Sequence, residues 1–554
     1  MKILALLTAL LTAPSAYAQF SPNPALNLAV RDQPGITEVL PRTAPAPNGG
    51  TWVSWFEAVP GTNYQLRIQL LDRSGNPQLG PAGVVVNNQP QSSALYRYDL
   101  KADAMGNALV AIQDTRSGTL QAVVHKIGPS GQLLWGTNGI QLLDNTATGG
   151  LAPTIAVLNS GNVVVAWNAS TTTTGQVSMQ KFSPAGVALW ASPVRVRGTG
   201  SYERPVPLPC GPDDVLLCYV RRTGFGLGVS AVQAQRFDAA GGPAWPNPVV
   251  VSNQAIGFGF FPEPVADGAD GFFVALNSGN PTQASLGDVW VQRVRADGTL
   301  WSPTGTPALT GTATARFDGH LQLAAGRNEL WAGLTVTNSG QSQSGLSLQR
   351  LDPATGTTQL GANGVAVQPI SPTLARNLFL RDTGTGLLLL YSESPTALID
   401  LLKATKVDYQ GVAAWPAPIA LASANSHKLH FDATTFRANQ LVLVWEDERQ
   451  GQGIYAQNLS DTGTLGPLAT ARFRPAAPLQ LAPNPSPAPT LYWPASAHPT
   501  TLLVRDLTGR VVFKTSVSGT ASYTLDGPAL ALGAYLIEAT DDAGNRWHTR
   551  WVRN

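Results

Sequence analysis

The chain has 554 residues, a formal net charge of +2, 13% charged residues and 43% hydrophobic residues. This length allows three or four domains of about 100–200 residues, or one large repetitive domain. The low charged fraction excludes a heptad-rich coiled coil, and the hydrophobic fraction is high enough to exclude wholesale disorder. Since Lys and Arg form no block, we expect neither a nucleic-acid partner nor a polybasic membrane contact.

The first 18 residues have the layout of a signal peptide. Lys2 gives a short positive region, residues 3–11 form an apolar region, and Ala16-Tyr17-Ala18 is a small-x-small cleavage site. We expect cleavage between Ala18 and Gln19. The apolar region is shorter than the roughly 20 residues that a membrane span needs, and no later segment reaches that length. The sequence therefore predicts export through the periplasm to the medium or outer cell surface, with no transmembrane segment.

Residues 19–473 contain a repeat of about 55 residues. Each copy has four short β-type runs separated by turn residues, as residues 154–196 show most clearly. Three markers recur in eight copies at intervals of 52 to 58 residues for the first marker. The first marker is apolar: Trp55, Ile112, Trp167, Tyr219, Leu276, Leu334, Tyr391 and Trp445. The second is mostly Gln: Gln69, His125, Gln180, Gln235, Gln292, Gln349, Thr405 and Gln457. The third is Gly: Gly75, Gly131, Gly186, Gly241, Gly298, Gly356, Gly411 and Gly463.

A repeat of this length with four strands is typical of a propeller blade. The turn-rich composition and the absence of a 3.6-residue period exclude an α-solenoid, and β-helix repeats are much shorter. We therefore predict an all-β protein in which an eight-bladed β-propeller occupies residues 19–473. Residues 26–31 resemble an outer strand and are expected to complete the last blade. Residues 468–473 are the alternative closing strand.

Only two cysteines are present, Cys210 and Cys218, on either side of a Gly-Pro-Asp-Asp turn. An exported protein can form disulfides. In a hairpin centred on this turn, Cys210 is expected opposite Val215 and not opposite Cys218. The spacing therefore favours Cys218 as a small core residue, although a bulge that shifts the register would allow a disulfide.

The composition changes after residue 473. Residues 474–480 form a Pro- and Ala-rich linker, and residues 481–554 alternate between apolar and polar positions with frequent turns. This pattern predicts a small Ig-like β-sandwich of six or seven strands.

The tail contains four motifs in order: a Pro-Asn-Pro opening, an Asp-x-x-Gly-Arg-x-Val strand end, a Leu-x-x-Gly-x-Tyr segment and a basic last strand. With these motifs it resembles the C-terminal sorting domain of type IX secretion substrates. The resemblance implies export by the type IX secretion machinery, followed by removal of the tail and release or surface attachment. The matching residues are Pro483, Asn484, Pro485, Asp506, Gly509, Arg510, Gly533 and Tyr535.

Several motifs suggest chemistry, and each has a simpler structural explanation. Residues 295–301 are similar to the Asp-box of sialidases but lack its Ser/Thr-x-Asp start; a Gly turn and a Trp packed between blades suffice. The Asp447-x-Arg449 pair recurs as Asp114-x-Arg116, which favours a solvated ion pair at a loop edge over a catalytic pair. Residues 267–271 resemble a fragment of a calcium loop but align with an inter-strand turn.

His427 and His430, with Asp432 nearby, could suggest a metal site. On a strand, residues three apart point to opposite faces, and two histidines are fewer than a catalytic zinc site uses. We therefore assign no catalytic, cofactor-binding or metal-binding residues.

Three classes of function remain open for the propeller. A non-catalytic binding or adhesion module, with a glycan or protein ligand at one face, matches the sequence best. A sialidase-like or other carbohydrate-active hydrolase or lyase would need charged side chains from several blades to meet at the central channel. A structural role in a surface layer is the third class.

Overall fold

The computed structural model describes residues 19–60, 63–91, 97–171, 175–224, 230–256, 260–279, 287–311, 315–467, 479–493, 500–506, 510–517, 522–526, 530–540 and 546–554. The predicted signal peptide with Ala18, most of the linker, the alternative closing strand and Gly509 lie outside these residues. The chain divides into two compact units, Met1–Leu468 and Ala469–Asn554. Within the described part, no helix is long and apolar enough to span a membrane.

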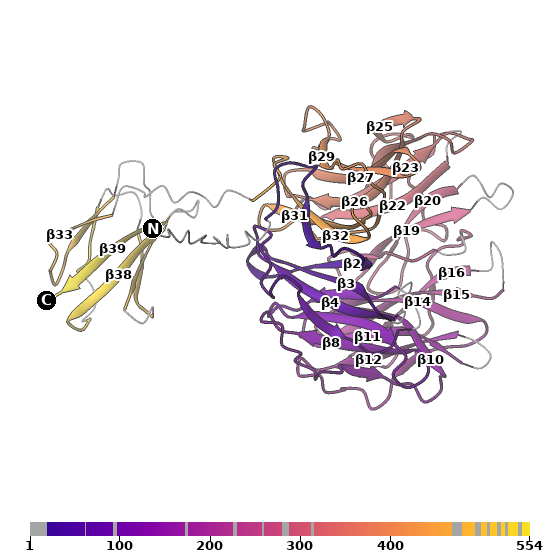
Figure 1. Cartoon of the computed structure of the whole chain (residues 1–554), viewed down its shortest axis with the longest axis horizontal. Helices are drawn as coiled ribbons and strands as arrows, with labels where there is room; N and C mark the ends of the chain where they lie inside the picture. The colour runs from indigo at the N-terminus through magenta and orange to yellow at the C-terminus, as the bar shows by residue number, and fades with distance from the viewer. Residues whose placement is uncertain are drawn as a thin grey trace, which may run out of the picture. The chain divides into compact units, whose positions relative to one another are not determined.

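The first unit consists of eight four-stranded antiparallel sheets, each formed almost entirely from consecutive strands (Figure 1). The strands of the first four sheets are β2 (Glu38–Pro45), β3 (Thr51–Val59), β4 (Asn63–Leu71) and β5 (Val84–Asn87); β6 (Asp99–Ala102), β7 (Ala108–Asp114), β8 (Gln121–Ile127) and β9 (Ile140–Leu142); β10 (Gly149–Val157), β11 (Val163–Ser170), β12 (Gly175–Phe182) and β13 (Val194–Val196); β14 (Ser201–Cys210), β15 (Asp214–Arg222), β16 (Ser230–Phe237) and β17 (Val249–Val250).

The other four sheets repeat this order, except that the last takes its fourth strand from the start of the chain. They contain β18 (Val265–Ala266), β19 (Phe272–Gly279), β20 (Gly287–Val294) and β21 (Thr306–Pro307); β22 (Ala315–Ala324), β23 (Glu329–Thr337), β24 (Ser344–Leu351) and β25 (Val365–Ser371); β26 (Leu374–Asp382), β27 (Leu387–Thr396), β28 (Ile399–Val407) and β29 (Ile419–Ala422); β30 (Lys428–Ala433), β31 (Gln440–Asp447), β32 (Gly453–Ser460) and β1 (Leu28–Arg31). Two short 3-10 helices, η1 (Pro47–Gly49) and η2 (Ala325–Arg327), connect first and second strands.

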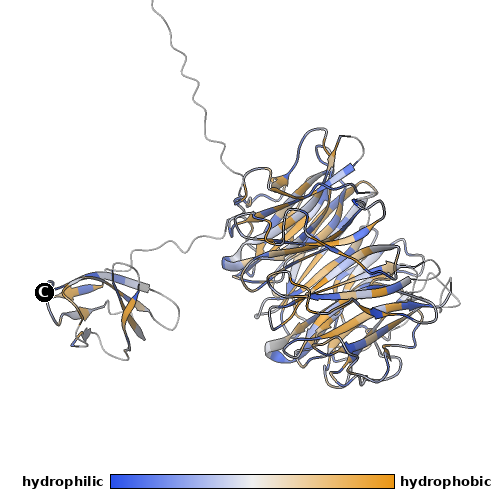
Figure 2. Cartoon of the chain, turned by 90° about the horizontal axis from the view of Figure 1, so that it is seen from below, coloured by the Kyte–Doolittle hydropathy of each residue, from blue (hydrophilic) through white to orange (hydrophobic). Residues whose placement is uncertain are grey.

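Consecutive sheets pack face to face through separate hydrophobic clusters. A further cluster joins the eighth sheet to the first and contains Val444 of β31 and Val53 of β3. First strands of neighbouring sheets contact each other, as β2 contacts β6 and β30, and β22 contacts β26. The first strands therefore surround the centre of a closed ring, which is the arrangement of a β-propeller. Figure 2 shows that apolar residues are concentrated in the strands.

The three sequence markers occupy equivalent places in all eight sheets. The apolar marker lies on the second strand and is buried in each sheet, as Trp167 is on β11. The second marker lies on the third strand, where Gln180 Nε2 donates to the carbonyl of Trp190 at 3.2 Å. The Gly marker adopts a positive φ in every copy, 85° at Gly186, because the turn after the third strand needs a left-handed residue.

The N-terminal strand closes the ring, as the sequence predicts. β1 pairs antiparallel with β32, with Leu28 opposite Ala456, so the indigo start of the chain lies beside orange strands in Figure 1. Leu28 is only 3% exposed. Gln457 Nε2 donates to the carbonyl of Ser21 at 3.0 Å, so the N-terminal segment takes the place that a sheet's own connection occupies elsewhere.

The hairpin between β14 and β15 differs from the prediction by one residue. Cys210 lies opposite Asp214, not Val215, because the turn contains three residues, Gly211-Pro212-Asp213. Cys218 lies opposite Val206 instead. Both cysteines are buried free thiols, so the disulfide that a shifted register would have allowed does not form.

The described residues of the second unit form seven strands in two sheets that share one hydrophobic cluster. The cluster includes Leu491, Val504, Ile537 and Trp551. One sheet contains β33 (Gln480–Ala482), β34 (Thr490–Tyr492) and β37 (Ser522–Thr524). The other contains β36 (Val511–Ser516), β35 (Thr501–Arg505), β38 (Gly533–Thr540) and β39 (Arg546–Arg553).

Candidate functional site

A β-bulge recurs in the first strands, where they face the centre of the ring. An L-residue at positive φ costs on the order of 1 kcal/mol or more, and bulges commonly redirect side chains. Side chains on the second strand of the preceding sheet accept hydrogen bonds from the backbone N–H groups of these residues. Asn168 Oδ1 accepts from the Arg204 N–H at 2.7 Å, and Gln113 Oε1 accepts from the Ala152 N–H at 3.3 Å. The bulge residues with positive φ are Leu40, Ala152, Arg204, Asp318 and His430.

Charged side chains from several sheets meet at the centre of the ring. Arg97 lies just before β6 of the second sheet, and Glu263 lies just before β18 of the fifth. The two side chains are 3.9 Å apart although their sheets are not neighbours, so the contact crosses the centre. His320 Nδ1 of the sixth sheet lies 3.5 Å from Glu263 Oε2. Phe261 lies under two guanidinium groups, with 4.9 Å from its ring centroid to Arg97 Cζ and 4.4 Å to Arg204 Cζ.

Arg381 of the seventh sheet adds a third guanidinium group. Its nitrogens donate to the carbonyls of Thr434 and Ala433 at 3.0 and 2.9 Å, and the group lies 4.9 Å from the centroid of Phe379. Phe379 in turn lies 5.8 Å from the His320 ring. Six side chains form this central cluster: Arg97, Arg204, Phe261, Glu263, His320 and Arg381.

Two arginines of the central cluster contact carboxylates only at distances longer than a hydrogen bond. The nearest contacts are 3.9 Å for Arg97 with Glu263 and 3.8 Å for Arg204 with Glu203. Within the sheets, by contrast, the Arg293–Asp267 pair closes to 2.7 Å, and Glu203 itself bonds more closely to Arg222. No ion pair forms at Arg381 among the described residues. Arg204 also donates to the Phe260 carbonyl, and all three guanidinium nitrogens of Arg381 donate to main-chain carbonyls. Since a guanidinium group has five N–H donors, each arginine keeps donors that no close carboxylate occupies.

The carboxyl group of Glu263 is strongly acidic. The side chain is 58% exposed, but the protein around it still desolvates the carboxyl group, which raises its pKa. The hydrogen bond and charge of His320, followed by the charges of Arg97 and Arg381, outweigh this effect and lower the pKa to about 2. Desolvation is the main cause that lowers the pKa of Arg204 and of Arg381, and a guanidinium remains charged after such a shift. The centre of the ring therefore has an ionised Glu263 beside three guanidinium groups, with the carboxyl groups of Glu203 near Arg204 and of Asp432 near Arg381.

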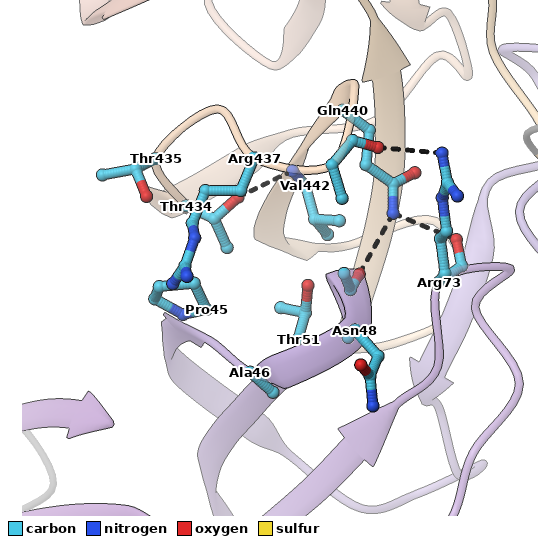
Figure 3. Close-up of a pocket in the computed structure, with 13 residues that line it drawn as sticks. Pro45, Ala46, Asn48, Thr51, Arg73, Thr434, Thr435, Arg437, Gln440 and Val442 are labelled. Carbon is cyan, nitrogen blue, oxygen red and sulfur yellow. Dashed lines mark hydrogen bonds between the residues drawn. The ribbon is translucent and has the colours of Figure 1, made fainter. Parts of the chain in front are cut away.

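A pocket of about 470 Å³ lies where the eighth sheet meets the first (Figure 3). Gln440 Nε2 donates to the carbonyls of Gly49 and Arg73 at 3.2 and 3.0 Å, and Arg73 donates to the carbonyl of Ala438 at 2.9 Å. These bonds connect the two sheets, so the polar lining of this seam pocket helps to close the ring. Arg437 is an exposed member of the lining.

The Asp-x-Arg motifs are structural ion pairs, but they are not solvated as expected. Asp447 and Asp114 are fully buried at the ends of second strands. Arg449 lies 2.6 Å from Asp447, whose carboxylate also accepts the indole N–H of Trp445 at 2.8 Å. The motif lies where the second and third strands meet, in a sheet whose two faces both pack against neighbouring sheets. The carboxylates are therefore buried, whereas the sequence predicted a solvated pair.

The other sequence candidates are separated or structural. His430 Nδ1 lies 2.8 Å from Glu446, whereas His427 lies 3.6 Å from Asp400, so the two histidines have different partners. Across the described ranges, no three His, Cys, Asp or Glu side chains form a group that could hold a metal ion. Residues 267–271 form the turn between β18 and β19, as predicted. The indole N–H of Trp301 donates to the carbonyl of Pro353 in the next sheet at 3.1 Å, which gives this Trp a packing role.

The residues of the sorting resemblance are brought together in part. Asn484 joins the start of the second unit to its last strand: its Nδ2 donates to the Arg550 carbonyl, and its Oδ1 accepts from Val552 N, both at 2.9 Å. Arg510 Nε lies 3.2 Å from the Asp506 carboxylate. Elsewhere in the unit, the Tyr535 hydroxyl donates to the Ala531 carbonyl at 2.7 Å, Gly533 begins β38, and Pro483 and Pro485 follow cis peptide bonds.

No protein-family model and no curated protein sequence matches this chain. Similar solved structures include a protein of unknown function from Dyadobacter fermentans, at 9% identity over 78% of this chain and 96% of that one, with a TM-score of 0.35. An ulvan lyase of a polysaccharide lyase family is 12% identical over 81% and 95% of the two chains, with a TM-score of 0.39. A microbial sialidase is 10% identical over 62% and 74%, with a TM-score of 0.31. At these values the similarity carries no argument about activity.

Sequence reasoning missed the central cluster. Its members are single residues in different copies and share no motif. A weak signal was present: Arg204 and Glu263 both precede a proline at the first strand of their repeat, as Leu40 and Ala152 do. A residue before Pro is restricted in conformation, so four such dipeptides at one repeat position indicated an irregular inner strand.

Proposed function

We propose that this chain is an exported eight-bladed β-propeller that binds a ligand at the centre of its ring and reaches the cell surface or medium through its C-terminal sorting domain. The observation that supports ligand binding is the central cluster. Its charged and aromatic side chains come from five different sheets. Its Arg–Glu contacts are 3.8 and 3.9 Å long, whereas the Arg293–Asp267 pair within the fifth sheet is 2.7 Å long. Perturbed charged groups that converge in this way are typical of functional sites.

The protonation state of Glu263 favours binding over hydrolysis. A glycoside hydrolase needs a carboxylic acid that is protonated near neutral pH, together with a second carboxylate. The pKa of Glu263 is about 2, so its carboxylate is ionised, and the neighbouring Glu203 is engaged by Arg222. The alternative, a carbohydrate-active lyase, has one observation in its favour: the imidazole of His320 lies in the central cluster, 3.5 Å from Glu263, and an imidazole is a common general base.

A glycan array with the mature chain (residues 19–554) tests this function. Binding by the wild type, and its loss in an Arg97→Gln/Arg204→Gln variant that keeps its melting temperature, would support a site at the ring centre. Equal binding by both proteins, or no binding of any glycan or surface protein, would contradict it. Incubation of the bound glycan with wild type distinguishes the alternative, because a lyase shortens the chain and creates a double bond that absorbs ultraviolet light.

The sorting role is supported by the separate core of the second unit and by the bonds of Asn484 to the last strand. Deletion of residues 475–554 is expected to abolish delivery to the surface or medium and to leave the propeller folded in the periplasm. Asn484→Ala should reduce delivery by loosening the last strand, and Thr515→Ala, on an exposed edge strand of the same unit, is its control. Fractionation of cells that shows undiminished extracellular protein after the deletion would overturn this assignment.

A further inference from the structure

The central cluster has the chemistry of a site for an acidic saccharide. We infer that its ligand is a carboxylated sugar chain, whose carboxylate groups bind Arg97, Arg204 and Arg381 while a sugar ring lies near Phe261. This inference rests on the proposed function and specifies the ligand of the same site.

The guanidinium groups of the central cluster have N–H donors for such a ligand, and their contacts within the protein occupy only some of them. Arg97 and Arg204 contact carboxylates only at 3.9 and 3.8 Å, beyond hydrogen-bond distance. Arg204 donates to the Phe260 carbonyl and Arg381 to main-chain carbonyls, so their remaining N–H groups are the donors for a ligand. Guanidinium groups bind carboxylates through paired, charge-assisted hydrogen bonds, and this binding is strong where the site is partly desolvated. Desolvation of Arg204 and Arg381 is what lowers their pKa values.

Glu263 shows that the cluster accepts a carboxylate. Its side chain is 58% exposed, yet the surrounding His320 and arginines stabilise its charged form. It is an internal anion among cations that come from the second, sixth and seventh sheets. A ligand carboxylate would compete with it for Arg97. Removal of the Glu263 charge should therefore strengthen binding of an acidic ligand, whereas loss of an arginine should weaken it.

A sugar is favoured over an acidic peptide by Phe261. This ring is 38% exposed, and the guanidinium groups of Arg97 and Arg204 lie 4.9 and 4.4 Å from its centroid, so its exposed part is an aromatic surface beside carboxylate-binding groups. Aromatic rings bind the apolar faces of flat, amphipathic ligands, and carboxylated sugars combine such a face with an anionic group.

Titration calorimetry with the mature chain tests the inference. The probes are a short oligogalacturonate, a neutral malto-oligosaccharide of the same length and a hexaglutamate peptide. We expect binding of the oligogalacturonate alone, weakened at least about tenfold by Arg97→Gln or Arg204→Gln, and strengthened by Glu263→Gln. Arg437→Gln, at the seam pocket, is the matched control and should change nothing.

The outcomes separate this inference from the proposed function. Binding of the neutral sugar with the same loss in Arg97→Gln would overturn the acidic ligand but keep the ring centre as the site. Preference for hexaglutamate would overturn the sugar. Loss of binding only in Arg437→Gln would move the site to the seam pocket, and weaker binding by Glu263→Gln would refute competition by that carboxylate. If no probe binds and the glycan array is also empty, the proposed function fails as well.

Discussion

Removal of the N-terminal strand should loosen two sheets that lie at opposite ends of the repeat array. Phe20, Leu28 and Val30 are buried in the cluster that joins the eighth sheet to the first. At about 1.5–3 kcal/mol for each buried side chain, their loss costs about 5–9 kcal/mol, before the main-chain bonds to β32 at about 1 kcal/mol each. This is comparable with the total stability of a typical domain, about 5–15 kcal/mol.

Hydrogen exchange on a chain that lacks residues 19–31 measures this effect. We expect faster exchange in β32, whose edge becomes exposed, and in β3, which loses its packing partner, while β15 in the fourth sheet changes least. A milder pair avoids global unfolding: Leu28→Ala should cost about 2–5 kcal/mol. Leu26→Ala is the control and should cost less than about 0.5 kcal/mol, because Leu26 is 65% exposed. Unchanged protection of β32 in the truncated chain would refute ring closure by β1.

Three further predictions concern buried polar groups. Burial is the main cause that raises the pKa of Glu38 from 4.5 to about 7. Between these pH values the folded state keeps a proton that the unfolded chain releases, so the free energy of unfolding should fall by up to about 3 kcal/mol as the pH rises from 4.5 to 7. Glu38→Gln should remove this pH dependence in urea unfolding measured across that range. Trp190→Phe removes the 3.1 Å hydrogen bond from the indole N–H to the Ala239 carbonyl and should lower the free energy of unfolding by about 1 kcal/mol or more. An unchanged melting temperature in thermal unfolding would contradict this prediction. Cys210 and Cys218 should resist thiol reagents until the protein unfolds, because burial raises both pKa values; a mass change on reduction of the native protein would instead reveal a disulfide.

The repeat could be predicted because each marker has the same local task in every copy. Trp167 and its equivalents fill the space between sheets, and Gly186 and its equivalents adopt the left-handed turn that L-residues disfavour. The closing strand could be predicted for the same reason, since residues 26–31 repeat the pattern of an outer strand. A structural requirement that recurs in every sheet produces a residue pattern that recurs in the sequence.

The central cluster could not be predicted, because the ring brings together residues that the sequence keeps apart. Arg97 and Glu263 meet only when the second and fifth sheets face each other across the centre. The register predicted for the Cys210 hairpin was wrong for a local reason. The same residues fit a three-residue or a four-residue turn, and the choice shifts every later pair.

A crystal structure of residues 19–554 with bound oligogalacturonate tests the central claim most directly. We predict a carboxylate of the sugar bonded to Arg97 and Arg204 at the centre of the ring, with Glu263 displaced from Arg97. Sugar bound at the seam pocket or on the outer strands, with the central cluster unchanged, would contradict it.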